Sequence, residues 1–121
     1  MIPLRIRIAF TFEGELRVPI HHESMLHGLI FHSIRDPEYR DTLHNRGFVY
    51  ENRQFRMFCY SKLQGRYVVQ EQHMIFKPPV SFLFSTHDER LIRELTSSLF
   101  AKDTVMIGTH PVRLLSIQQV S

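Results

Sequence analysis

The residues best suited to chemistry in this sequence are its histidines, of which there are eight. An imidazole has a pKa near about 6.5, so it can accept or donate a proton at neutral pH. His44 stands at the expected end of a short helix. Beside a cation such as an arginine, a histidine could cut RNA, because RNA carries its own nucleophile in the 2′-hydroxyl. The alternative is that His44 only interacts favourably with the helix dipole.

The sequence contains none of the usual signatures of a metal or cofactor site. Cys59 is the only cysteine, and there is no His-Glu-x-x-His motif or aspartate-rich calcium loop. His27 and His32 would lie about 140° apart around a helix, which makes a shared metal difficult. His21 and His22 have no nearby residues to complete a set of ligands. No glycine-rich loop follows a strand, so we expect neither a metal nor a nucleotide cofactor.

Residues 54–62 alternate in the way typical of a strand. We expect Phe55, Met57 and Cys59 to face the core. The opposite face would then carry Arg56, Phe58, Tyr60 and Lys62. Cations beside aromatic rings suit single-stranded RNA, because the cations neutralise phosphates and the bases stack on the rings. An ordinary sheet face with aromatic cross-strand pairs is an equal alternative. Arg5 and Arg7 would extend the basic surface if the first strand lies beside this one.

The segment 21–35 has the apolar spacing of a helix, with Leu26, Leu29 and Ile30 on one face. Phe31 lies away from that face, and His27 stands one turn before it. A large ring at this position has two interpretations: it covers the short helix expected at 37–45, or it packs against a ligand.

The elements that would position these residues follow the order of a ferredoxin-like fold. Thr86 and Glu89 match a capping box at the start of a helix that ends near Ala101. We expect strands at 2–10, 54–63, 66–70, 72–76, 80–85, 104–107 and 111–120, and helices at 21–35, 37–45 and 86–101. This order predicts a single α+β domain over 1–121 with the split βαβ arrangement, an antiparallel sheet with two main helices on one face.

The composition is that of a folded protein with a mild basic excess. Of the 121 residues 43% are hydrophobic, and the formal net charge is +3. No apolar run approaches the roughly 20 residues that a membrane helix needs, and charges interrupt the N-terminal apolar stretch, so no signal peptide is expected. A lone cysteine fits a reducing compartment. We therefore expect a cytoplasmic protein without a membrane partner.

Several blocks of this sequence resemble the CRISPR-associated repeat-RNA endoribonucleases of the RAMP superfamily. The matching blocks are Val18-Pro19-Ile20-His21-His22, Leu26-His27-Gly28-Leu29-Ile30-Phe31, Leu43-His44-Asn45, Phe55-Arg56-Met57-Phe58-Cys59-Tyr60-Ser61, Ser85-Thr86-His87-Asp88-Glu89 and the strands from Val105 to Ile117. Their spacing is preserved over essentially the whole chain. The resemblance implies metal-independent binding and cleavage of CRISPR repeat RNA, leaving a 5′-hydroxyl and a 2′,3′-cyclic phosphate.

The resemblance also implies roles for individual residues. His44 would be the proton-transfer residue and Arg56 the phosphate stabiliser. Phe31 falls where some members have a tyrosine, and a phenylalanine has no hydroxyl with which to transfer a proton. The candidate RNA contacts are Phe31, His27, Arg5, Arg7, Tyr60 and Lys62.

Members of this family are about twice as long and contain two ferredoxin-like domains, so the chain looks like the N-terminal half of such a protein. The expected partners are CRISPR repeat RNA and a C-terminal RAMP domain or other CRISPR effector proteins. An exposed sheet edge would favour a homodimer. Two other functions stay open: a non-catalytic RAMP-like RNA-binding subunit, and a ferredoxin-like ligand-binding or assembly module that binds no nucleic acid.

Overall fold

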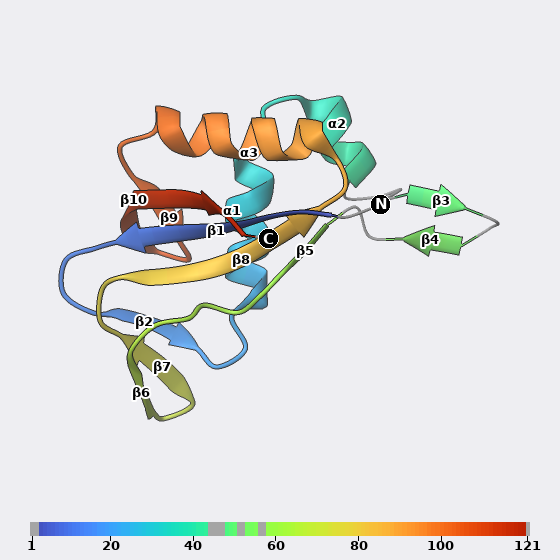
Figure 1. Ribbon diagram of the computed structural model, residues 1–121. Coiled ribbons are helices and arrows are strands. Elements are labelled where there is room, and N and C mark those ends of the chain that lie inside the picture. Colours follow the sequence, from blue (N-terminus) through green and yellow to red (C-terminus); the bar gives the residue numbers. More distant parts are fainter. Residues whose placement is uncertain (1–2, 44–47, 51–52, 56–57, 121) are drawn as a thin grey trace.

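The computed structural model describes residues 3–43, 48–50, 53–55 and 58–120. Its largest layer is a five-stranded sheet of order β5-β8-β1-β10-β9 in which neighbouring strands are antiparallel (Figure 1). The strands are β1 (Leu4–Thr11), β5 (Phe58–Tyr60), β8 (Val80–Thr86), β9 (Val105–Ile107) and β10 (His110–Gln119). Helices α1 (Glu23–His32) and α3 (Glu89–Ala101) pack on one face of this sheet. The order β1-α1-β5-β8-α3-β10 is that of a ferredoxin-like fold, so the predicted fold class is confirmed.

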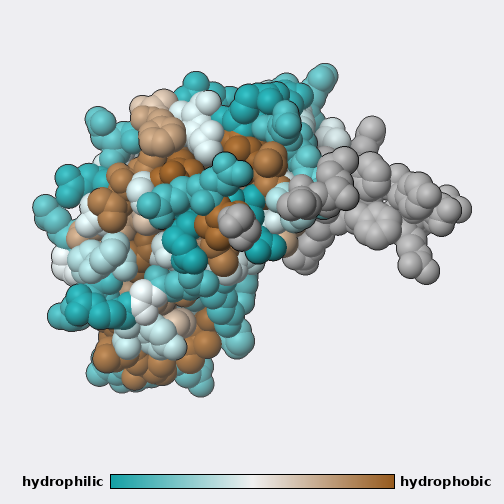
Figure 2. Space-filling model, in the orientation of Figure 1, coloured by the Kyte–Doolittle hydropathy of each residue, from teal (hydrophilic) through white to brown (hydrophobic). Residues whose placement is uncertain are grey.

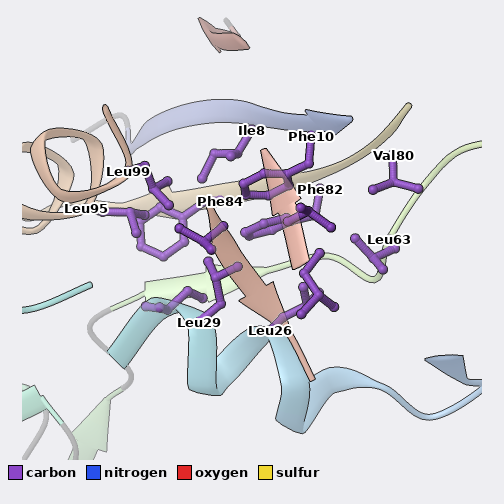
Figure 3. Close-up of a cluster of buried hydrophobic side chains, with 14 of the residues drawn as sticks. Ile8, Phe10, Leu26, Leu29, Leu63, Val80, Phe82, Phe84, Leu95 and Leu99 are labelled. Carbon is purple, nitrogen blue, oxygen red and sulfur yellow. The ribbon is translucent and has the colours of Figure 1, made fainter. Parts of the chain in front are cut away.

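Alternation along β1 decides which face of the sheet is buried. Ile6, Ile8 and Phe10 are buried, whereas Arg5 on the other face is exposed. The sheet residues of this core meet leucines from both helices; Figure 3 labels Ile8, Phe10, Phe82, Phe84, Leu26, Leu29, Leu95 and Leu99. Because a fully buried side chain of this size stabilises by about 1.5–3 kcal/mol, this shared core holds both helices on the sheet.

Helix α3 begins differently from the prediction. Asp88 is its N-cap, and the Asp88 carboxylate accepts a hydrogen bond from the backbone N–H of Arg90 at 3.0 Å. Thr86 still belongs to β8, and its hydroxyl accepts from the backbone N–H of Asp88 at 3.1 Å. The predicted capping box was therefore wrong, because a carboxylate two residues further on is the better acceptor beside the positive end of the helix.

Additional elements are inserted between those of the ferredoxin-like core. Strands β2 (Leu16–Pro19), β7 (His73–Phe76) and β6 (Tyr67–Gln70) form a second sheet of order β2-β7-β6. Strands β3 (Phe48–Tyr50) and β4 (Arg53–Phe55) form a hairpin. The short helix α2 (Pro37–Asp41) is capped by Asp36, and the end of the predicted helix at 45 lies outside the described residues. Helix α1 is shorter than the predicted 21–35.

The helices within the described part of the chain are short or amphipathic. None of them is long and apolar enough to cross a membrane.

Candidate functional site

The two residues predicted to carry the chemistry, His44 and Arg56, lie outside the described residues. The elements on either side of them are described. Helix α2 ends at Asp41, shortly before His44, and β5 begins at Phe58, shortly after Arg56. The roles of both residues therefore stay predictions.

Helix α1 and strand β5 meet through an aromatic cluster, which we define as His27, Phe31, Phe58 and Tyr60. The ring centroids of His27 and Phe31 are 4.4 Å apart, and those of Phe31 and Phe58 are 5.8 Å apart. Phe58 also stacks on Tyr60 at 6.1 Å. These separations are favourable for aromatic pairs. Phe31 is only 9% exposed, so its ring is held mainly by the contact between α1 and β5.

The structure reverses the predicted faces of β5. Phe58 and Tyr60 pack against the core, whereas Cys59 is exposed on the opposite face. The physical reason is the area buried: two aromatic rings remove far more apolar surface from water than one thiol does. The rings of Phe58 and Tyr60 are therefore half-buried beside α1, and do not stand on an open sheet face.

Polar groups surround the outer edge of the aromatic cluster. The Tyr60 hydroxyl donates to the backbone carbonyl of Glu23 at 3.2 Å and lies 3.5 Å from Nδ1 of His27. Lys62 donates to the carbonyl of Ile20 at 3.3 Å, and its Nζ lies 3.4 Å from the Glu23 carboxylate. The pKa of Glu23 is lowered, mainly because its own backbone N–H donates to the carboxylate and further because Lys62 is positively charged. Lys62 is therefore accessible but already paired with an acid.

The two predicted arginines lie on the other face of the sheet, which the helices leave open. Arg7 donates to the Gln64 side chain at 2.7 Å and to the Ser81 hydroxyl at 3.3 Å. Arg5 is exposed and lies opposite Ser85 in the β1–β8 register, and Cys59 flanks Ser85 on the other side. The candidate RNA contacts thus fall into two groups, one on the open face and one at the α1–β5 edge.

His22 has a structural position that the sequence did not reveal. It is fully buried, and its Nδ1 bonds to the Pro19 carbonyl at 2.9 Å. Its Nε2 accepts from the backbone N–H of Leu63 at 3.0 Å, so the ring is neutral with its proton on Nδ1. His22 therefore ties the start of α1 to the chain that follows β5.

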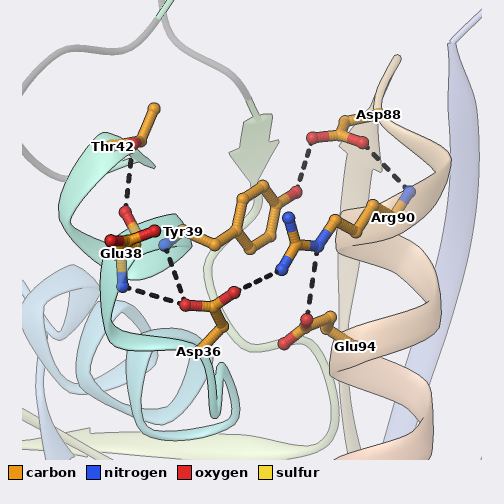
Figure 4. Close-up of polar contacts among 7 residues, drawn as sticks. All are labelled: Asp36, Glu38, Tyr39, Thr42, Asp88, Arg90 and Glu94. Carbon is orange, nitrogen blue, oxygen red and sulfur yellow. Dashed lines mark hydrogen bonds and ion pairs between the residues drawn. The ribbon is translucent and has the colours of Figure 1, made fainter.

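A polar network joins α2 to the start of α3 (Figure 4). The Tyr39 hydroxyl donates to Asp88, and the Arg90 guanidinium lies over the Tyr39 ring at 4.0 Å. Arg90 also binds Asp36 at 2.7 Å and Glu94 at 3.4 Å. Burial and the nearby Asp88 raise the pKa of Tyr39, and the Arg90 hydrogen bond lowers the pKa of Asp36. The network fixes the helix from which the chain continues toward His44.

A half-open cavity of about 550 Å³ lies between α1 and β9. Its lining includes four apolar side chains, a histidine and a lysine: Met25, Leu29, Val105, Met106, His32 and Lys102. Its walls come from segments far apart in the sequence, so no local sequence pattern marks it. Among the described residues, no three His, Cys, Asp or Glu side chains are grouped so that they could hold a metal ion.

Comparison with known proteins identifies the class of fold. The chain has the ferredoxin-like fold of CRISPR-associated Cas6 and RAMP proteins, as the sequence resemblance predicted. No protein-family model matches the sequence, and no curated protein matches it. Solved structures therefore carry the comparison.

Three of these structures illustrate the similarity. A CRISPR associated protein Cas6 superimposes with a TM-score of 0.72 and 19% identity over 98% of this chain and 49% of its own. A RAMP protein described as binding different RNA substrates superimposes with a TM-score of 0.72 and 16% identity, over 98% of this chain and 48% of its own. The product of a Cas6-related gene from Pyrococcus furiosus superimposes with a TM-score of 0.76 and 13% identity, over 98% of this chain and 48% of its own. The chain spans about half the length of these structures.

Proposed function

We propose that this chain is the N-terminal half of a Cas6-like endoribonuclease that binds and cleaves CRISPR repeat RNA without a metal. The observation that carries the proposal is the similarity of fold to Cas6 over 98% of the chain. The matched structures are about twice as long, so we infer that a C-terminal RAMP domain completes the enzyme and that other CRISPR effector proteins are further partners.

In the proposed reaction, the 2′-oxygen of the RNA attacks the adjacent phosphorus and the bond to the 5′-oxygen breaks. One proton leaves the 2′-hydroxyl and one reaches the departing 5′-oxygen, which gives a 2′,3′-cyclic phosphate and a 5′-hydroxyl. His44 would transfer one of these protons, and Arg56 would offset the charge that develops on the phosphate. Phe31 takes no part in proton transfer, because it has no hydroxyl.

Both groups of candidate contacts are compatible with RNA binding. The exposed guanidinium of Arg5 and the neighbouring Arg7 are suited to phosphates on the open face of the sheet. Lys62 and His27 offer polar contacts at the α1–β5 edge, where Tyr60 and Phe31 hold the supporting rings in place.

The second candidate function is a non-catalytic RNA-binding subunit of RAMP type. The observation in its favour is Phe31, which lacks a hydroxyl and is buried, so that position contributes no polar group to a reaction. A ferredoxin-like module that binds no nucleic acid is the remaining alternative.

A cleavage assay with labelled CRISPR repeat RNA in EDTA tests the proposal. The wild-type chain, alone and with a Cas6-type C-terminal domain supplied, is compared with His44→Ala. His87→Ala is the matched control, because His87 is an exposed histidine beside α3. We expect a cyclic phosphate product that His44→Ala lowers by about 10²-fold or more, the usual contribution of a proton-transfer group, and that His87→Ala leaves unchanged.

The outcomes separate the candidate functions. Salt-sensitive binding without cleavage in any combination would favour the RNA-binding subunit. If the chain neither binds nor cleaves the RNA, its similarity to Cas6 would be one of fold only. Cleavage that survives in His44→Ala would contradict the assignment of that residue.

A further inference from the structure

The second sheet ends in an exposed apolar edge strand, β6. Tyr67, Val68 and Val69 expose 50%, 63% and 59% of their surface. Figure 2 shows a hydrophobic patch at the bottom of the molecule, where Figure 1 places β6 and β7. Monomeric proteins usually blunt such an edge with charges, prolines or bulges, because its unpaired backbone groups accept a further strand. This edge therefore has the features expected of an interaction surface.

The hydrogen bonds of β6 show which of its backbone groups face outward. The N–H of Lys77 donates to the carbonyl of Arg66 at 3.0 Å, so Arg66 directs its backbone groups toward β7. In an antiparallel ladder this direction alternates, so Val68 also points toward β7. The N–H and C=O of Tyr67 and Val69 consequently point to the free edge, where β6 has no neighbouring strand among the described residues.

We propose that β6 pairs antiparallel with β6 of a second copy of this chain, with the two Val68 residues opposite each other on a two-fold axis. Hydrogen bonding across the edge requires residues with outward-facing groups to lie opposite one another. Tyr67 of each copy then lies opposite Val69 of the other. An aromatic residue opposite a β-branched one is a favourable cross-strand pair, and the two-fold axis forms it twice.

The charges of the hairpin identify a second copy as the partner. Arg66 and Lys77 lie at one end of the β6–β7 hairpin and Glu71 at its tip. In the two-fold pairing, the acidic tip of each copy lies beside the basic end of the other. The Glu71 side chain is 81% exposed, and its carboxylate lies 3.6 Å from Arg17 of β2. An exposed ion pair contributes little to stability, so Glu71 can exchange Arg17 for Arg66 of the other copy by turning toward the free edge.

Two other antiparallel registers also place residues with outward-facing backbone groups opposite one another, but they are less favourable. An axis through Val69 would place Tyr67 opposite Glu71. An axis through Tyr67 would place Arg66 opposite Val68. Either arrangement sets an apolar side chain against a charged one, so the axis through Val68 is preferred.

The proposed contact is small, so association depends on protein concentration. Two short edge strands bury much less than the roughly 1,200 Å² at the lower end of stable interfaces. A covalent trap is therefore the sharpest test. We would place Val68→Cys in a Cys59→Ser background, because the native Cys59 is exposed and could also cross-link.

The expected distance between the Cβ atoms of the two copies distinguishes Val68→Cys from its control. Directly opposed residues at a non-hydrogen-bonded position have Cβ atoms about 4.5–5.5 Å apart, close to disulfide geometry. Val69→Cys in the same background is the matched control, since the two copies of Val69 would be diagonal neighbours roughly 7–8 Å apart. We expect mild oxidation to give several-fold more linked dimer with Val68→Cys. Equal or reversed yields, or no linked dimer in either variant, would overturn the proposal.

Sedimentation equilibrium gives an independent measurement on the unmodified chain. RNA is removed first, so that it cannot bridge two copies, and the result does not depend on any nuclease activity. We expect the apparent mass to rise toward twice the monomer mass as concentration increases, and Val68→Lys to remain monomeric because an edge lysine opposes strand pairing. A wild-type chain that stays monomeric at every concentration would contradict the proposal.

Discussion

At the scale of single residues, the two adjacent histidines His21 and His22 differ completely in surroundings. His22 is fully buried and uses both ring nitrogens, one on the Pro19 carbonyl and one on the Leu63 N–H. His21 is exposed. A buried polar group that loses its partner costs more than an exposed one, because water cannot replace the lost hydrogen bond. His22 therefore has a structural role, whereas its neighbour His21 is a surface residue.

We predict that His22→Ala lowers the free energy of unfolding by roughly 2–4 kcal/mol, because the buried N–H of Leu63 and the partly buried carbonyl of Pro19 lose their partners. His21→Ala is the control and should change it by no more than about 0.5 kcal/mol. Urea denaturation followed by circular dichroism measures both. Equal effects of the two substitutions would show that the His22 hydrogen bonds contribute nothing to stability.

At the scale of elements, the attachment of α2 depends on charged groups contributed by α3. The Asp36 carboxylate caps α2 and at the same time binds Arg90. Its pKa is lowered, chiefly by the Arg90 hydrogen bond. A carboxyl with a lowered pKa in the folded state stabilises the fold above its unfolded pKa, and this contribution is lost as pH falls through the folded pKa.

We predict that Asp36→Asn is less stable than wild type at pH 7. The difference should narrow as pH falls below the ordinary aspartate pKa of about 3.9 and should be lost once pH passes the lower pKa of folded Asp36. Asparagine retains the capping ability, so the variant removes mainly the charge. Asp41→Asn, at an exposed position on α2, is the control and should show no such narrowing. The measurement is urea denaturation at several pH values. A difference independent of pH would exclude the ion pair as its cause.

The sequence predicted most elements but not their finer placement. Clear period-two alternation in β1 and β8 and helical spacing in α3 identified the core, because burial imposes those periods. The faces of Phe58 and Tyr60 were assigned wrongly, since alternation separates two faces without saying which one meets a helix. The network of Tyr39 and Arg90 joins residues far apart in the chain, and a local sequence pattern cannot predict such a contact. His44 and Arg56 keep their predicted roles untested.

At the scale of the whole molecule, the candidate RNA contacts lie on two surfaces. Arg5 and Arg7 are on the open sheet face, whereas Lys62 lies at the α1–β5 edge beside Glu23. Arg5 is exposed, and Arg7 hydrogen-bonds to the neutral side chains of Gln64 and Ser81. Lys62, in contrast, must first give up an acidic partner before it can neutralise a phosphate. The open face is therefore expected to contribute more to RNA affinity.

We predict that Arg5→Ala and Arg7→Ala each weaken binding of labelled repeat RNA and each reduce the slope of log affinity against log salt by about 0.7–0.9. Arg93→Ala is the control, because Arg93 is an exposed arginine on α3, on the helical side of the sheet. Fluorescence anisotropy over a range of salt concentrations gives the slopes. Slopes that remain equal in all three variants would place the RNA elsewhere.

The position of β1 in the sheet has a consequence for how the protein folds during its synthesis. The first strand lies at the centre, between β8 and β10, and residues Ile6 to Thr11 pair with Arg113 to Gln119. During synthesis, β1 must wait until the chain has been made as far as β10 before its second neighbour exists. Contacts of such long sequence separation make folding slow. The nascent chain therefore carries an unfinished sheet, and the core closes only when β10 arrives.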